Sequence, residues 1–148
     1  MGLSTYLKAY NYMSDAFDNK LYERVSGALE GIVPLDIGLR HNAHRNIQIE
    51  IPIATWHKGY SVDWFLWEKA GERDTDEYEI ESWTPDVEDL ILEARDYAEN
   101  PDRASRFGSP EEDPEWISKQ FLRLERALTD FVLDDRLKSW TLKVWRSY

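Results

Sequence analysis

Four isoleucines occupy every second position between Ile47 and Ile53. A period of two places all four on one face of a β-strand. The positions between them hold two polar residues and a proline, which are Gln48, Glu50 and Pro52. Pro52 has no N–H to offer to a neighbouring strand, which favours a place at the edge of a sheet. This alternation predicts a strand with one apolar face.

An aromatic segment follows this strand. Residues 62–69 are predicted to form a helix, because Tyr60, Trp64 and Trp67 recur at helical spacing beside Phe65. Gly71 stands where a helix commonly ends. A strand that leads into an aromatic helix predicts the start of a packed core.

The composition limits the class of protein. A chain of 148 residues predicts one domain over 1–148, large enough to bury a core. It has no cysteine, which excludes disulfides and thiolate chemistry. The net charge of −11 disfavours direct binding to nucleic acid or to an anionic membrane and favours cationic partners. With no long apolar run and no signal peptide, we expect a cytoplasmic protein.

The remaining segments alternate between strands and helices. Strands are predicted over residues 2–13 and 77–81 and after Asp135. Helices are predicted to begin at Thr84-Pro85 and at Asp113-Pro114, where a capping residue precedes a proline, and the second should run for about 20 residues. This order predicts an α+β fold with a mostly antiparallel sheet and helices packed on one side.

One basic segment interrupts the acidic chain. It carries five side chains that could hold a phosphate or a carboxylate, which are Arg40, His44, Arg45, His57 and Lys58. His41 and His44 resemble half of a metal site, but no predicted helix orients them, so we predict no metal. A solvated loop is the plainer interpretation of the same residues.

An acidic stretch follows from Glu72 to Asp89, with nine carboxylates against one base. Its candidate partner-binding residues are Glu77, Glu79, Glu81, Asp86 and Glu88. Carboxylates on alternate strand residues recur every ~6.6–6.8 Å, so such a row could imitate the phosphates of a nucleic acid and occupy a basic surface. The charged outer face of an edge strand explains the pattern equally well.

Aromatic residues supply the last candidate surface. Trp140 and Trp145 fall on opposite faces of the last predicted strand, so one of them is a candidate interface anchor. We find no nucleophile motif, no metalloprotease motif and no phosphate-binding glycine loop, and we therefore predict no cofactor and no catalytic residue.

The chain resembles a family of small uncharacterised bacteriophage and prophage proteins that begin M-G-L-x-x-Y-L. The resemblance rests on the opening Met1-Gly2-Leu3 with Tyr6-Leu7, and on Trp56-His57-Lys58, Trp64-Phe65, Glu77-Tyr78-Glu79, Phe107-Gly108-Ser109 and Trp140. The family's helix carries Arg, Asn and His where a polar ligand site would be expected. This chain keeps only Lys58 and an aromatic pair there, so no site is carried over. The resemblance implies a phage origin and hence the cytoplasm of the host cell.

These features predict a non-enzymatic protein that binds, and inhibits, a host defence or nucleic-acid-handling protein with a basic surface. This is the manner of an anti-CRISPR inhibitor whose acidic surface mimics nucleic acid. A first alternative is a small-ligand binder or enzyme that uses the basic segment on a phosphorylated ligand or nucleotide signal. A second alternative is a structural phage protein.

Overall fold

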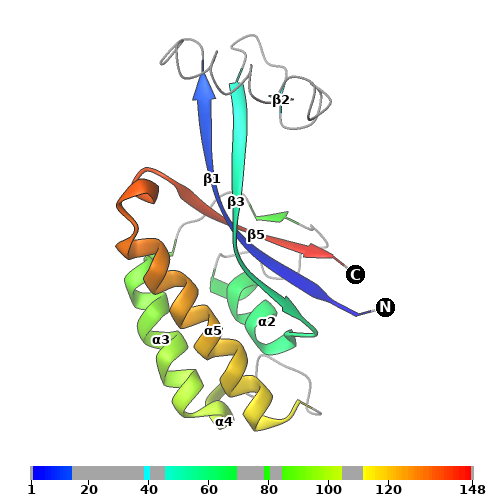
Figure 1. Ribbon diagram of the computed structural model, residues 1–148. Helices are drawn as coiled ribbons and strands as arrows, with labels where there is room; N and C mark the ends of the chain where they lie inside the picture. The colour runs from blue at the N-terminus through cyan, green and yellow to red at the C-terminus, as the bar shows by residue number, and fades with distance from the viewer. Residues whose placement is uncertain are drawn as a thin grey trace. The chain divides into compact units, whose positions relative to one another are not determined.

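The structure is a computed structural model that describes residues 2–14, 39–40, 46–69, 79–80, 85–104 and 112–147, with side chains for 2–11, 50–69, 85–104 and 112–147. Its elements are β1 (Ser4–Ser14), β2 (Leu39–Arg40), β3 (Asn46–His57), α2 (Tyr60–Lys69), β4 (Glu79–Ile80), α3 (Val87–Glu99), α4 (Pro101–Ala104), α5 (Pro114–Leu133), the 3₁₀ helix η2 (Asp135–Leu137) and β5 (Thr141–Ser147) (Figure 1).

The fold is α+β, as the sequence predicts. The chain divides into two compact units, one of residues 1–9 with 52–148 and the other of residues 10–51. The first unit holds all the helices named above together with β4, β5 and parts of β1 and β3. The prediction of one domain over residues 1–148 stays a prediction.

The strands form an antiparallel sheet in the order β2-β3-β1-β5-β4. β2 pairs with the start of β3, and β4 pairs with β5 so that Glu79 lies opposite Trp145 and Ile80 opposite Val144. β3 therefore lies between β2 and β1, and the prediction of an edge strand is wrong at its start. Among the described residues β2 pairs only with Asn46 and Ile47, so Pro52 lies beyond this pairing and disturbs no ladder with β2.

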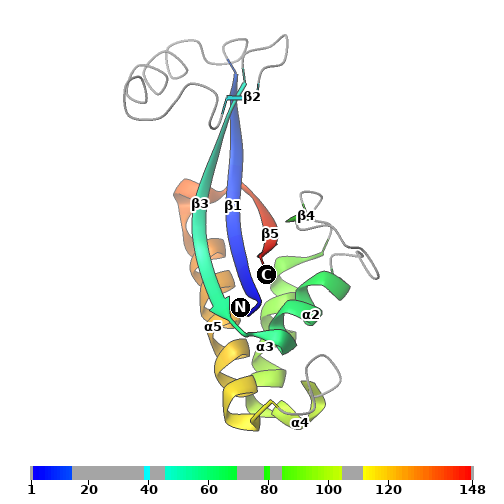
Figure 2. The same ribbon diagram turned by 90° about the vertical axis from the view of Figure 1, so that its right-hand side faces the viewer.

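The core of the first unit lies between the sheet and the helices, which cover one face (Figure 2). Alternate residues are buried here, which are Leu3 just before β1 and Thr5, Leu7 and Ala9 within it. The intervening Tyr6 packs instead against Trp145, with ring centroids 4.9 Å apart. The period of two in β1 thus separates a buried face, covered by the helices, from an opposite face on which Tyr6 packs against Trp145.

Helix α2 begins two residues before the predicted start, and its buried face differs from the predicted stripe. Trp67 is buried, but Trp64 is 54% exposed. The buried side chains include Val62 and Phe65, and the Phe65 ring meets the Phe121 ring edge to face. Apolar residues surround most of this helix, so spacing alone could not identify the face that packs against α5.

Helices α3 and α5 each bury an apolar stripe at helical spacing. Leu90 and Ala94 of α3 and Ile117, Phe121, Leu124 and Leu128 of α5 are buried. The predicted cap of α5 is correct, because Asp113 accepts the Glu115 N–H and Pro114 begins the helix, which is 20 residues long.

The predicted start of α3 is wrong. Asp86 is the N-cap, and its carboxylate accepts the N–H groups of Glu88 and Asp89. Pro85 therefore precedes the cap rather than beginning the helix. After Asn100 the chain continues into the short helix α4.

Candidate functional site

The predicted basic segment is only partly described. His44 and Arg45 lie outside the described residues, and Arg40 belongs to β2 with no described side chain. His57 and Lys58 are exposed at the end of β3. His57 Nδ1 lies 3.0 Å from Ser4 Oγ, so this imidazole has a partner on β1. An anion site formed by these five residues stays a prediction.

The backbone of Lys58 has a structural role. Its φ of 55° is left-handed, a conformation that non-glycine residues rarely adopt. In this turn its N–H donates to the Leu3 carbonyl at 2.7 Å, and its own carbonyl accepts from Trp116 Nε1 at 3.2 Å. The turn therefore ties the end of β3 to β1 on one side and to α5 on the other.

The predicted acidic face is also partly described. Glu77 and Glu81 lie outside the described residues, and Glu79 is placed only by its pairing with Trp145. Asp86 and Glu88 are exposed in the first turn of α3. Asp86 caps the helix, so its carboxylate serves the fold whatever else it contacts.

The two candidate interface tryptophans lie in different environments. Trp140 packs against the core, and Trp145 packs against Tyr6 with Lys8 Nζ 5.1 Å from its ring centroid. Both are half-buried rather than exposed. Their role in an interface stays a prediction.

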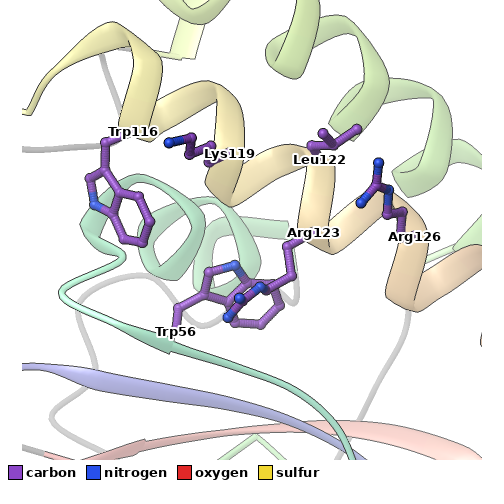
Figure 3. A pocket seen from close by; sticks show the side chains of 6 residues that line it. All are labelled: Trp56, Trp116, Lys119, Leu122, Arg123 and Arg126. Carbon is purple, nitrogen blue, oxygen red and sulfur yellow. The ribbon is translucent and has the colours of Figure 1, made fainter.

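A cavity lined by several cations lies between β3 and α5. It has a volume of about 430 Å³ and is lined by Trp56, Trp116, Lys119, Leu122, Arg123 and Arg126, which we call the basic groove (Figure 3). Trp56 comes from β3 and the other five from α5. Lys119, Arg123 and Arg126 recur at spacings of four and three, which places three cations on one side of this helix.

Hydrogen bonds hold the walls of the basic groove together. Trp56 Nε1 donates to the Gln120 carbonyl at 3.1 Å, which joins β3 to the backbone of α5. Arg123 Nη1 donates to the Thr55 carbonyl at 2.8 Å, so this guanidinium lies against the strand. These two bonds hold Trp56 and Arg123 against the facing element.

The electrostatics of the groove set it apart. Among the described side chains, four arginines pair with carboxylates, which are Arg95, Arg103, Arg136 and Arg146. Arg123 and Arg126, the two remaining described arginines, have no carboxylate within ion-pair distance in the described part of the chain. Lys119 forms an ion pair with Glu115 at 3.6 Å. Two arginines without a carboxylate partner among the described residues thus lie beside Lys119 on one surface of an acidic protein.

A partly buried network joins Glu112 and Gln120 to the start of α2. The Glu112 carboxylate accepts the Ser61 N–H at 2.9 Å and the Gln120 side-chain amide at 2.5 Å. Gln120 Oε1 in turn accepts the Val62 N–H at 3.1 Å. Two N–H groups that have no partner within the helix are satisfied in this way.

A second buried polar cluster joins α2 to β1 and β5. Asp63 is 2% exposed and accepts hydrogen bonds from Thr5 Oγ1 at 2.7 Å and from Arg146. Burial raises the pKa of the Asp63 carboxyl, and the hydrogen bonds from Arg146 and Thr5 oppose that rise. The Arg146 guanidinium also lies 4.2 Å from the centroid of the Trp67 ring. This cluster is enclosed, so it contributes to packing rather than offering a surface.

The comparisons with known proteins leave the site to be judged on its own geometry. No protein-family model, curated protein or solved structure matches this chain. Within the residues that the structure describes, no three histidine, aspartate or glutamate side chains gather as metal ligands would. No helix in the same part of the chain is long and apolar enough to cross a membrane.

Sequence reasoning did not single out the residues of the basic groove. A signal was present, because Lys119, Arg123 and Arg126 share one side of a predicted helix. Acidic residues between and around these three cations made the segment look mixed in charge. The spacing of residues along α5 also gives no information about Trp56, which comes from another element.

Proposed function

We propose that this protein binds an anionic ligand in the basic groove. The observation that supports this most directly is the pair Arg123 and Arg126, which lack carboxylate partners in the described part of a chain whose net charge is −11. Guanidinium groups bind carboxylates and phosphates through two parallel hydrogen bonds. Trp116 and Leu122 add apolar surface to the same cavity. The sequence predicts binding of a phosphorylated ligand by the basic segment as an alternative function. The function proposed here is of the same class, but it uses different residues.

The overall charge shapes how such a ligand would be recognised. A field set by −11 charges repels anions at long range, so association gains little from steering. Recognition then depends on short-range contacts inside the groove, where Arg123 is already fixed by its bond to Thr55. Binding should accordingly favour ligands that match the shape of the groove over simple anions of equal charge.

Thermal unfolding with a panel of anions tests the proposal. The panel contains inorganic phosphate, nucleotides and short acidic peptides, because a ligand that binds only the folded state stabilises it by about 2.7 kcal/mol at a hundred times its Kd. The double variant Arg123→Ala with Arg126→Ala should lose the shift, while Arg136→Ala, which removes a guanidinium outside the groove, should keep it. An unchanged unfolding temperature for the native protein with every anion would refute the proposal.

A second candidate function is inhibition of a host protein with a basic surface, as predicted from the acidic face. This function would imply a phage origin. We propose it because the first turn of α3 exposes Glu88 and Asp89, and Leu92 of the same helix is 60% exposed. Leu92 also lines a cavity of about 510 Å³ with Lys69, Pro85, Asp86, Asp89, Leu90 and Glu93. An apolar side chain among carboxylates suits a basic protein surface with an apolar anchor.

A pull-down from host lysate tests this second function. Association with the captured protein should slow as salt rises, because screening shortens the reach of charge to about 8 Å at physiological ionic strength. Changing Glu77, Glu79 and Glu81 to Gln removes three charges. At low salt this variant should associate more slowly than the native protein. Equal association rates for this variant and the native protein at low salt would exclude the acidic row from the interface.

A further inference from the structure

The outer edge of β3 faces the basic groove. The Thr55 carbonyl accepts a hydrogen bond from Arg123 of α5. Backbone groups of alternate residues in an antiparallel strand point to the same edge, so Ile53 turns its N–H and C=O to the α5 side as well. Among the described residues β2 pairs only with Asn46 and Ile47, which leaves this stretch of the edge without a described strand partner.

A second cavity follows this edge. It has a volume of about 310 Å³ and is lined by Ile53, Ala54, Thr55, Arg123, Arg126, Ala127 and Asp130. Arg123 and Arg126 line both this cavity and the basic groove, so the two cavities adjoin at the arginines. Together they form a path along β3 from Ile53 to Trp56. It is bordered by the strand on one side and by α5 on the other, where two cations, Arg123 and Arg126, stand beside one carboxylate, Asp130.

We propose that the ligand of this path is an acidic peptide segment that lies extended along β3. This inference rests on the proposed anion-binding function and names its ligand class. Main-chain groups of the peptide would pair with the edge of β3 at Ile53, which has no strand partner among the described residues, as in other cases of strand addition. Carboxylates on alternate peptide residues, which lie on one face of an extended chain, would meet Arg123 and Arg126.

The shape of the path favours a peptide over a compact anion. A single phosphate fills little of two adjoining cavities and has no use for a strand edge. A peptide uses both features, because its backbone satisfies the edge while its side chains satisfy the arginines. The half-buried Trp116 and the partly exposed Leu122 lie at the groove end of the path, where an apolar residue of the peptide would be covered.

Fluorescence anisotropy with a labelled peptide of alternating glutamate and valine tests the inference on the full chain. A second peptide of the same sequence, N-methylated at alternate residues, keeps every charge but cannot pair along one edge. The first peptide should bind, and the second should bind at least about tenfold more weakly. Arg126→Ala should weaken the first peptide by about tenfold. Arg126 has no side-chain hydrogen bond or ion pair with another residue in the described part of the chain, so this variant should fold normally.

Further variants separate the causes. Replacing Arg123 and Arg126 by Lys keeps the charge and loses the paired geometry, so it should weaken binding less than replacement by Ala. Arg136→Ala should leave the peptide affinity unchanged.

The outcomes distinguish this inference from the function on which it rests. Equal binding of the two peptides would overturn strand addition and leave anion binding in place. Stabilisation by phosphate or a nucleotide without peptide binding would do the same. Self-association with rising protein concentration that is lost in Arg126→Ala would overturn a separate peptide and identify a second copy as the occupant. No binding of any anion would overturn both.

Discussion

The Asp63 carboxylate and the Arg146 guanidinium form an ion pair in the core, although 83 positions separate them in the chain. The side chain of Asp63 is 2% exposed and that of Arg146 is 13% exposed. Burial penalises both charges, and their mutual attraction offsets that penalty only while both partners are present. The pair therefore makes β5 and α2 dependent on each other, and it leads to two predictions.

The first prediction concerns the loss of the cation. Arg146→Met leaves the Asp63 carboxylate buried with only Thr5 as a strong donor, which should lower the free energy of unfolding by about 3 kcal/mol at pH 7. Urea denaturation measures this change. Adding Asp63→Asn to Arg146→Met should recover part of the loss, because the uncompensated charge is gone. If the double variant is as unstable as the sum of the two single variants, the pair is not coupled.

The second prediction concerns pH. The pKa of Asp63 is raised in the folded state, so the folded protein holds this proton to a higher pH than the unfolded chain does. The stability that comes from protonated Asp63 is fully present below about pH 3.9, the unfolded pKa, and is lost as the pH rises through the folded pKa. The stability of the native protein relative to Asp63→Asn should therefore decrease as the pH is raised from about 3.9. A relative stability that increases over this range would mean that Arg146 lowers the pKa more than burial raises it.

The third prediction separates folding from binding on the acidic face. Asp86 caps α3 with two accepted N–H groups, so Asp86→Ala should cost about 1 kcal/mol of stability. Glu88 is exposed in the same turn, and Glu88→Gln should change stability by less than about 0.5 kcal/mol. Thermal denaturation of both variants checks the difference. Equal losses would show that the turn depends on charge rather than on the cap.

The fourth prediction concerns the network that joins Glu112 and Gln120 to the start of α2. Gln120→Leu keeps the size of the side chain but leaves the Val62 N–H without its acceptor, which should cost about 1–3 kcal/mol. Lys119→Gln changes the neighbouring exposed residue and should be almost silent. Chemical denaturation compares the two. A silent Gln120→Leu would show that water or another group replaces the amide.

The fifth prediction compares two tryptophans of α2. Trp67 is 2% exposed and Trp64 is 54% exposed, so Trp67→Ala should cost about 3–5 kcal/mol and Trp64→Ala far less. The fluorescence maximum should shift to shorter wavelength in Trp64→Ala, because the tryptophan that contacts water is removed. Similar stability losses in the two variants would contradict the placement of α2.

The candidate sites were harder to predict from the sequence than the helices. The spacing of Lys119, Arg123 and Arg126 was available in the sequence, yet the groove also needs Trp56 from β3. The two sites predicted from the sequence lie mostly outside the described residues. They are the basic segment with Arg40 and His44 and the acidic row from Glu77 to Glu81. A site built across two elements depends on side chains that meet only in the folded chain.

The sequence by itself determined the features that depend on neighbours a few positions away. The cap at Asp113, the proline after it and the apolar stripe from Ile117 to Leu128 specify α5, because helix ends and faces follow from local hydrogen bonds and a period of 3.6 residues. Only the tertiary structure decided that Trp64 faces outward, that Asp63 pairs with Arg146, and that Arg123 lies against Thr55. These arrangements join residues more than 60 positions apart or depend on how an element packs, and no local pattern encodes which distant side chain will complete a contact.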